Sequence, residues 1–351
     1  MKIAFLGDIS LNDNYIQLYK EGVNPFEVLE PLLQKSSFVV GNLECIAKGD
    51  FGENTLKQPR LTTTIETLNY LKNLNLKVAC LAQNHLYDHL IDGFNKTTAF
   101  LKENNIQYLG VGNDSNTKST PVIIEQDGIR VGILNYVSAD TNPNMPIDAE
   151  VVLNMFVLAN CINDIKELKQ HVDFVVISIH WGGRVEGGLY PDWDQPKNAR
   201  TLIDAGADLI IGHHSHTFQP YEKYKGKFIF YSLGNFCFSD YWFNNELNIM
   251  PERRMISTII EVNFEADRIS VMPDFYFNRM TYFEHYPNYS KIVQLRNLNF
   301  SIMRRIKPYW QLYYLHKRTV LPFVLFFKRS DLSFYQKIYR LVRYIRKKIV
   351  C

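Results

Sequence analysis

Cysteine is scarce in this sequence. Its five cysteines are spread over 351 residues, and no two of them stand in a CxxC spacing. This usage excludes a disulfide framework and a zinc knuckle, and it is typical of a protein kept in a reducing compartment. We therefore expect a cytoplasmic location.

Long hydrophobic runs are missing as well. A membrane-spanning helix needs about 18 consecutive apolar residues. The longest candidate near the C-terminus, TVLPFVLFF at 319–327, is far shorter and contains a proline. The opening MKIAFLGDIS has one lysine and a short apolar run, so we expect a first buried strand there and not a secretory signal. With 46% hydrophobic residues, the chain can bury a sizeable core.

Positive charge is concentrated at the C-terminal end. Residues 296–351 hold 14 Lys and Arg against one acid, whereas residues 1–295 hold 25 bases and 35 acids. The segment 335–350 places apolar residues at three- and four-residue spacing between basic ones, which predicts a basic amphipathic helix. Such a helix suits an anionic membrane surface and would place the protein peripherally on the inner membrane face. Packing of this helix on the acidic body is the alternative, and nucleic acid is disfavoured because the tail has no base-reading motif.

Strand patterns alternate with helical patterns over the first 240 residues. Short apolar runs predict strands at 2–8, 37–44, 78–85, 172–180, 207–216 and 227–235. Helical spacing predicts helices at 24–36, 63–75, 91–105, 160–171 and 195–206. Two hairpins are predicted, at 120–137 and 258–277. This order indicates an α/β domain with two sheets flanked by helices at 1–285, followed by a basic, aromatic-rich helical tail at 286–351.

Each of the six predicted strands ends in polar residues. They are Asp8; Asn42 and Glu44; Asn84 and His85; His180; His213, His214 and His216; and Asn235. Each one alone has an ordinary structural explanation, such as a helix cap or a turn. Ligands bind at the carboxyl ends of strands in α/β sheets, so together these residues predict one site. Carboxylates, an amide and imidazoles suit divalent Mn, Zn or Fe.

Several motifs resemble a known family. GNLE, NHLYDH, ISIHWGG, LIDAGADLIIGHHSH and FYSLGNF are similar to the CapA, or poly-γ-glutamate synthesis, family of capsule synthesis proteins. That family belongs to the calcineurin-like metallophosphoesterase superfamily. The similarity covers roughly residues 1–275 and is most specific over 180–236. It implies a four-layer αββα sandwich with a metal centre at the strand ends. The basic C-terminal helical tail would be an extension of this sandwich.

The resemblance implies a role for each residue of the site. The metal ligands would be Asp8, Glu44, Asn84, His180, His214 and His216, with Glu44 as the bridging carboxylate and His213 supporting or replacing a ligand. The catalytic residues would be His85 and, as its orienting partner, Asp88. Substrate contacts are expected from Asn42, Glu186 and Asn235. Arg184 has no counterpart in the family pattern, but its guanidinium could pair with an anionic substrate oxygen. One or two divalent ions would clamp a phosphate ester and activate water, and His85 would protonate the leaving oxygen.

One position departs from the superfamily pattern. Ser10 stands where the superfamily has a metal-binding histidine, so one ion would lose a nitrogen ligand. The leading hypothesis is a metal-dependent phosphoesterase-like hydrolase in the synthesis of a bacterial capsule or other surface polymer. The alternative is a non-catalytic metal-binding accessory protein that holds an anionic polymer or a synthase partner. A nuclease is less favoured, because the main body is acidic.

Overall fold

The computed structural model describes residues 1–114, 117–243, 246–328 and 333–339. The chain forms two compact units, Met1–Leu298 and Asn299–Cys351. The first unit contains both large sheets and the strand ends with the polar residues. The predicted division into functional domains at residue 285 stays a prediction.

The first large sheet has the strand order β20-β19-β18-β1-β2-β5-β6, with β15 paired to the end of β1. Strands β1, β2, β5, β6 and β15 are mutually parallel, and β18, β19 and β20 extend the sheet in antiparallel fashion. The bounds are β1 (Lys2–Ile9), β2 (Phe38–Leu43), β5 (Leu76–Cys80), β6 (Gln107–Leu109), β15 (Asn235–Cys237), β18 (Ile256–Phe264), β19 (Ile269–Asn278) and β20 (Phe283–His285).

The second large sheet has the strand order β13-β14-β12-β11-β9-β8. Its central strands β9, β11, β12 and β14 are parallel, and each edge carries one antiparallel strand. The bounds are β8 (Val122–Gln126), β9 (Ile129–Val137), β11 (Phe174–His180), β12 (Leu209–His213), β13 (Tyr221–Tyr224) and β14 (Lys227–Phe230). Short strand pairs lie outside the two large sheets: β3 (Ile46–Ala47) with β4 (Thr62–Thr63), β7 (Val111–Gly112) with β10 (Val152–Leu153), and β16 (Tyr241–Phe243) with β17 (Glu246–Asn248).

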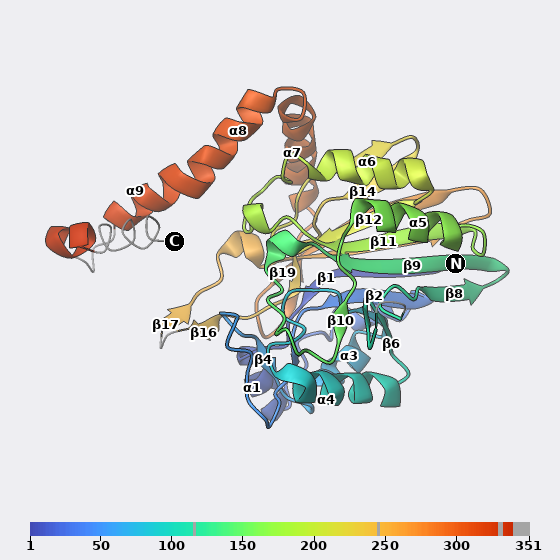
Figure 1. Ribbon diagram of the computed structural model, residues 1–351, viewed down its shortest axis with the longest axis horizontal. Helices are drawn as coiled ribbons and strands as arrows, with labels where there is room; N and C mark the ends of the chain where they lie inside the picture. Colours follow the sequence, from blue (N-terminus) through green and yellow to red (C-terminus); the bar gives the residue numbers. More distant parts are fainter. Residues whose placement is uncertain (115–116, 244–245, 329–332, 340–351) are drawn as a thin grey trace. The chain divides into compact units, whose positions relative to one another are not determined.

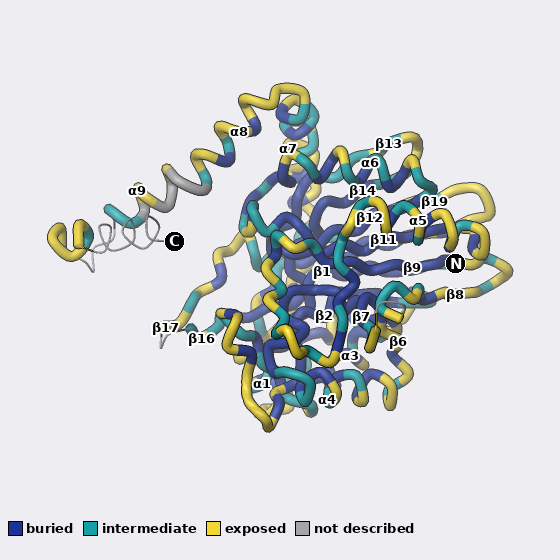
Figure 2. Tube along the Cα trace, in the orientation of Figure 1, coloured by how far each residue is buried: buried dark blue, intermediate teal, exposed yellow. Residues whose placement is uncertain are grey.

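The first unit is built in four layers (Figure 1). The two sheets pack face to face, with Phe5 and Val40 of the first and Val176 and Ile211 of the second in one apolar core. Helices cover the outer face of each sheet, and the buried strands run between these layers (Figure 2). On the first sheet they are α1 (Asn14–Lys20), α2 (Glu30–Leu33), α3 (Tyr70–Asn73) and α4 (Leu90–Glu103), and on the second α5 (Leu158–Leu168) and α6 (Gln195–Ala205). The predicted α/β class and αββα sandwich are confirmed.

The sequence of β1 shows why this layering forms. Ile3 and Phe5 lie in the core between the sheets, whereas Ala4 and Leu6 lie in the core under the helices. A strand that is covered on both faces buries every side chain, so it reads as a continuous hydrophobic run. This run is the signal that predicted a strand at 2–8.

The predicted strands and hairpins are present, but two predicted helices are much shorter. Within 24–36 only α2 is α-helical, since the Asn24 side chain accepts a hydrogen bond from the Phe26 amide and Pro31 stands at the helix start. Within 63–75 the helix begins at η1 (Thr67–Asn69), because the Thr64 hydroxyl accepts a hydrogen bond from the Thr67 amide. Short polar side chains compete in this way with helical hydrogen bonds.

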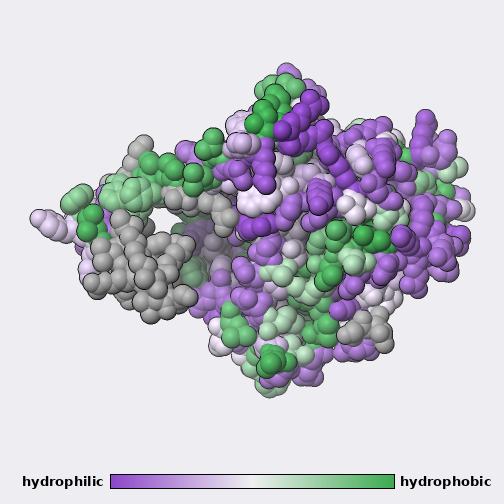
Figure 3. Space-filling model, turned by 45° about the horizontal axis from the view of Figure 1, so that its top comes forward, coloured by the Kyte–Doolittle hydropathy of each residue, from purple (hydrophilic) through white to green (hydrophobic). Residues whose placement is uncertain are grey.

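Helices continue into the second unit. They are α7 (Tyr289–Met303), which contains the boundary at residue 298, then α8 (Lys307–Leu315), η5 (His316–Val320) and α9 (Leu321–Lys328). Figure 3 shows hydrophobic side chains, in green, on the surface of this helical unit. Residues 334–339 are helical, and the rest of the predicted helix, 340–350, lies outside the described residues. No helix within the described ranges is long and apolar enough to cross a membrane.

Candidate metal centre

The carboxyl ends of the two sheets bring the predicted residues side by side. On the first sheet, Asp8 is in register with Asn42 on one neighbour and with Asn235 on the other. On the second, His180 is in register with His213. The Asn42 side-chain nitrogen joins the sheets, since it lies 3.0 Å from Asp8 Oδ1 and 3.2 Å from His180 Nδ1. Strand ends from both sheets therefore contribute to one site.

A glycine allows the close approach of β1 and β15. The Asp8 amide donates a hydrogen bond to the Gly234 carbonyl at 2.9 Å. A Cβ at Gly7 would overlap that same carbonyl oxygen, so a larger residue would push the two segments apart. Gly7 thus permits the pairing that sets Asn235 beside Asp8.

The loop after β12 holds two histidines in a left-handed backbone conformation. His214 has a φ of 86° and His216 a φ of 56°, which is uncommon for residues with a side chain. Specific contacts hold this conformation. The His214 amide lies 3.2 Å from Asp8 Oδ2, and His216 Nδ1 lies 2.8 Å from Asn235 Oδ1. Strained backbone of this kind persists where surrounding contacts fix it, and it is frequent at functional sites.

The first candidate ligand group consists of Glu44, His180 and His214. One ligand atom from each lies within 4.8 Å of the others. His180 Nε2 lies 3.0 Å from His214 Nδ1 and 3.8 Å from Glu44 Oε1. Asn84 Oδ1 lies 2.8 Å from the same His180 nitrogen. A carboxylate, an amide oxygen and two imidazoles thus face one point.

The second candidate group consists of Asp8, Glu44 and His216, again within 4.8 Å. His216 lies with Nδ1 3.7 Å from Asp8 Oδ2 and with Nε2 3.8 Å from Glu44 Oε1. Glu44 therefore belongs to both groups. This is where the resemblance placed a bridging carboxylate.

The chemistry of these side chains fits a divalent cation. Glu44 is 0% exposed, and neither carboxylate oxygen has a hydrogen-bond partner within the part of the chain that the structure describes. Burial and the neighbouring charge of Asp8 raise the pKa of Glu44 well above its ordinary value. A buried carboxylate is stable only with a compensating charge or hydrogen bonds, and a cation between the two groups would provide that charge.

The imidazoles are electrically neutral, as metal ligands must be. Burial, reinforced by the neighbouring histidines, lowers the pKa of His180 well below its ordinary value. Burial lowers the pKa of His214 to about 4. Neutral imidazoles with carboxylate and amide oxygens suit Zn, Mn or Fe, so the residues fit divalent metals.

His213 contacts Asp8 instead of joining either ligand group. Its Nδ1 lies 3.1 Å from Asp8 Oδ1. Burial alone would raise the pKa of Asp8, but the hydrogen bond from His213 keeps it below its ordinary value. His213 therefore helps to keep Asp8 ionised and correctly oriented.

His85 and Asp88 form a closely paired dyad at the pocket. His85 Nδ1 lies 2.6 Å from Asp88 Oδ2, which also accepts a hydrogen bond of 2.7 Å from the Leu61 amide. Asp88 is fully buried, whereas His85 lines the pocket. Because the contact occupies Nδ1, the ring presents Nε2 for other interactions. His85 is in neither ligand group.

The four residues predicted to contact substrate differ in their placement. Glu186 lines the pocket. Asn42 and Asn235 are buried and contact the predicted ligands instead of lining the pocket. Arg184 is engaged elsewhere, with Nε 2.5 Å from Asp192 Oδ2, a further ion pair to Asp194 and its guanidinium over the Trp193 ring.

Ser10 lies outside both ligand groups. It is fully buried, and its hydroxyl donates a hydrogen bond of 2.7 Å to Asn12 Oδ1. At the position where the resemblance led us to expect a histidine, the serine hydroxyl is thus hydrogen-bonded to Asn12.

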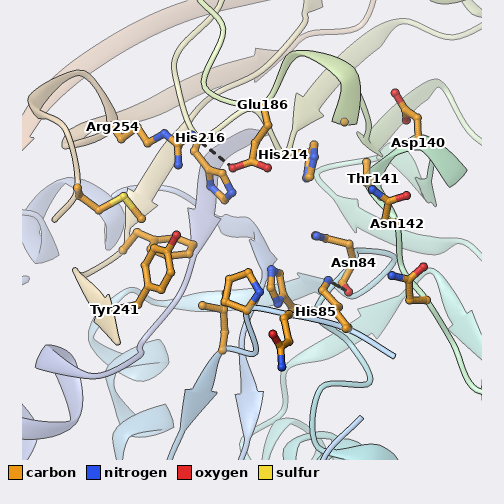
Figure 4. A pocket seen from close by; sticks show the side chains of 18 residues that line it. Asn84, His85, Asp140, Thr141, Asn142, Glu186, His214, His216, Tyr241 and Arg254 are labelled. Carbon is orange, nitrogen blue, oxygen red and sulfur yellow. Dashed lines mark hydrogen bonds and ion pairs between the residues drawn. The ribbon is translucent and has the colours of Figure 1, made fainter. Parts of the chain in front are cut away.

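A pocket of about 250 Å³ opens onto this centre. In Figure 4, Asn84, His85, His214 and His216 surround one space, and Arg254 lies beside Glu186. The sequence interpretation missed two cationic lining residues, Lys57 and Arg254. Lys57 stands in a loop, in TLKQP, and Arg254 in a short 3-10 helix, in PERRM, and neither belongs to a motif that could have identified it.

Comparisons with known proteins agree with the resemblance. The family model for the bacterial capsule synthesis protein PGA_cap matches residues 2–240. The PGA biosynthesis protein CapA of Bacillus subtilis is 31% identical over 256 residues, which cover 69% of this chain and 64% of that protein. The capsule biosynthesis protein CapA of Bacillus anthracis is 32% identical over 255 residues, or 69% of this chain and 61% of that protein. The chain thus spans less than two thirds of the length of these relatives.

A solved structure shares the fold. A crystal structure of a hypothetical protein from Thermus thermophilus superimposes with a TM-score of 0.50 at 13% identity. The similarity covers 79% of this chain and 99% of that one. It concerns the fold alone.

Proposed function

This chain belongs to the bacterial capsule synthesis protein family PGA_cap, and from that membership we propose that it is a metal-dependent phosphoesterase-like hydrolase acting in capsule or other surface-polymer synthesis. The observation that carries the proposal is Glu44, a fully buried carboxylate that belongs to both candidate ligand groups. A carboxylate shared between two groups suits a centre of two cations. Its substrate would be a phosphate ester.

Six residues would hold one or two divalent ions: Asp8, Glu44, Asn84, His180, His214 and His216. Such an ion supplies Lewis acidity toward a phosphoryl oxygen and lowers the pKa of a water molecule. The protein holds the metal-ligating side chains in position. Asn235 and Asn42 contribute here, since each contacts a donor side chain directly.

His85 would act on the leaving oxygen. Asp88 fixes the ring through Nδ1, so a proton held at Nε2 can pass to an ester oxygen in the pocket. Burial and the charge of Lys57 lower the pKa of His85, whereas Asp88 opposes this shift.

Metal analysis combined with hydrolysis assays tests this proposal. Purified protein would be analysed for Mn, Zn and Fe and assayed with a phosphate monoester and a phosphate diester, before and after chelation. We expect hydrolysis of one class that chelation abolishes and metal restores. Metal-replete protein that hydrolyses neither class would overturn the hydrolase proposal and favour the accessory role, in which the fold holds an anionic polymer or a synthase partner.

An anionic membrane surface is the partner that we propose for the C-terminal unit. Residues 296–351 hold 14 bases and one acid. The described part of this unit also exposes large apolar side chains, including Leu312, Leu315, Phe323 and Phe334. Basic and apolar side chains together favour binding in the lipid headgroup region. This would place the protein peripherally on the cytoplasmic face of the membrane.

A further inference from the structure

Two cationic side chains line the pocket, and the proposed metal centre uses neither of them. Lys57 stands in the segment between β3 and β4. Arg254 stands in η4 (Glu252–Arg254), just before β18. Almost two hundred residues separate them in the sequence, yet they reach the same cavity of about 250 Å³.

Lys57 is a buried cation that is attracted by three carboxylates, those of Asp88, Glu44 and Glu186, without an ion pair to any of them in the described structure. It is 6% exposed, and its ammonium donates a hydrogen bond to the backbone carbonyl of Asn84. Within the described ranges of the chain, no carboxylate oxygen lies within the 4.0 Å of an ion pair. Because Lys57 lines the pocket and its ammonium has further N–H donors, an anion in the pocket could accept a charge-assisted hydrogen bond from it.

The segment that carries Lys57 is fixed to the catalytic dyad. On one side the Asn54 amide donates to the Asp88 carbonyl at 2.9 Å, and on the other the Leu61 amide donates to Asp88 Oδ2 at 2.7 Å. Asp88 also orients His85. The lysine is thereby held in a defined position relative to His85, as a preorganised binding group should be.

Arg254 is fixed to the opposite part of the centre. Its carbonyl accepts a hydrogen bond of 3.0 Å from Asn235, whose other amide atom lies 2.8 Å from His216 Nδ1. Its guanidinium forms one long ion pair, with Nη2 3.3 Å from Glu186 Oε1. Since the Glu186 side chain is 48% exposed, this ion pair contributes little stability and can give way to a ligand.

We propose that Lys57 and Arg254 form an oxyanion-binding subsite beside the metal centre, which takes a phosphate or carboxylate group of a polyanionic substrate. A guanidinium fork matches either group, and the lysine adds a point charge. The inference rests on the proposed function, from which it takes the hydrolysis of a phosphate ester at the metal centre. It adds that the substrate carries an anionic group besides the ester that is cleaved.

Anion binding to the metal-replete, full-length protein tests the subsite. Isothermal titration calorimetry would use inorganic phosphate and glutarate, two mainly dianionic probes near pH 7.5, which distinguish the two oxyanions. We expect Lys57→Gln and Arg254→Gln each to weaken binding of at least one probe by tenfold or more, with unchanged metal content. The matched control is Arg253→Gln, which removes the neighbouring arginine that does not line the pocket and should keep wild-type affinity.

If Arg254→Gln binds both probes with wild-type affinity, the proposal is wrong. Because Arg254 is partly exposed, this variant provides the test even if Lys57→Gln fails to fold. Failure of the wild-type protein to bind either probe would overturn the proposal as well. Because no turnover is measured, the result is separable from the proposed function. A protein that hydrolyses no ester but shows the two losses keeps the subsite, whereas an active enzyme with unaltered affinities loses it.

Discussion

Replacing Glu44 by Gln should separate metal binding from folding. Glu44 is the residue shared by both candidate ligand groups, and its oxygens have no hydrogen-bond partner in the described structure. The amide has almost the same size but no charge. For the metal-free protein we therefore expect the free energy of unfolding to change by no more than about 1 kcal/mol, the scale of one hydrogen bond.

The metal-bound protein should respond very differently. A metal present at 100 times its Kd stabilises the folded state by about 2.7 kcal/mol. For a unit as large as Met1–Leu298, each kcal/mol raises the Tm by about 2 °C, so metal should add roughly 5 °C. In Glu44→Gln this rise should disappear, because both groups lose the negative charge of their shared carboxylate.

The assay is thermal unfolding with and without chelator, together with metal analysis. Asp8→Asn is the matched variant, since Asp8 belongs to the second group alone. It should lower the metal content while leaving the group of Glu44, His180 and His214 able to bind. A Glu44→Gln protein that retains the full metal-dependent rise in Tm would refute the reasoning.

Four further changes have defined outcomes. Replacing His85 by Ala should lower turnover by about 10²–10⁴-fold at unchanged metal content, and Asp88→Asn should lower turnover as well. Steady-state kinetics together with metal analysis checks this. Loss of metal in the His85→Ala protein would show that His85 is a metal ligand. The full-length protein should co-sediment with anionic vesicles but not with neutral ones, and deleting residues 304–351, beyond the end of α7, should abolish this binding. Equal sedimentation of the full-length and the truncated protein would contradict a membrane role. Gly7→Ala should destabilise the fold by about 1–3 kcal/mol in chemical denaturation and reduce metal content, whereas wild-type stability would show that β15 tolerates a shift.

The sequence predicted those residues of the candidate centre that stand at the ends of strands. Asp8, His180 and His214 each follow a run of buried residues, and parallel strands bring their carboxyl ends to one edge. Nothing in such a run indicates which neighbour a strand pairs with. The contact between Asn42 and His180 across the two sheets therefore emerges only from the fold.

The pocket residues Lys57 and Arg254 could not be predicted from strand ends. Lys57 and Arg254 reach the pocket because Asp88 and Asn235 anchor their segments through backbone hydrogen bonds. Such anchors leave no periodic pattern in the sequence. Arg184 shows the converse, because we expected its guanidinium to contact substrate, whereas the fold pairs it with Asp192.

The position of Ser10 bears on whether the centre is suited to catalysis. The first group offers four protein donors when Asn84 is counted with Glu44, His180 and His214, whereas the second offers Asp8, Glu44 and His216. Ser10 does not add a donor there, because its hydroxyl is committed to Asn12. Structural metal sites are filled by protein ligands, and catalytic sites keep a position open for water or substrate. With three donors against four, the second group is the one that would keep a position open for water or substrate, as the proposed hydrolysis requires.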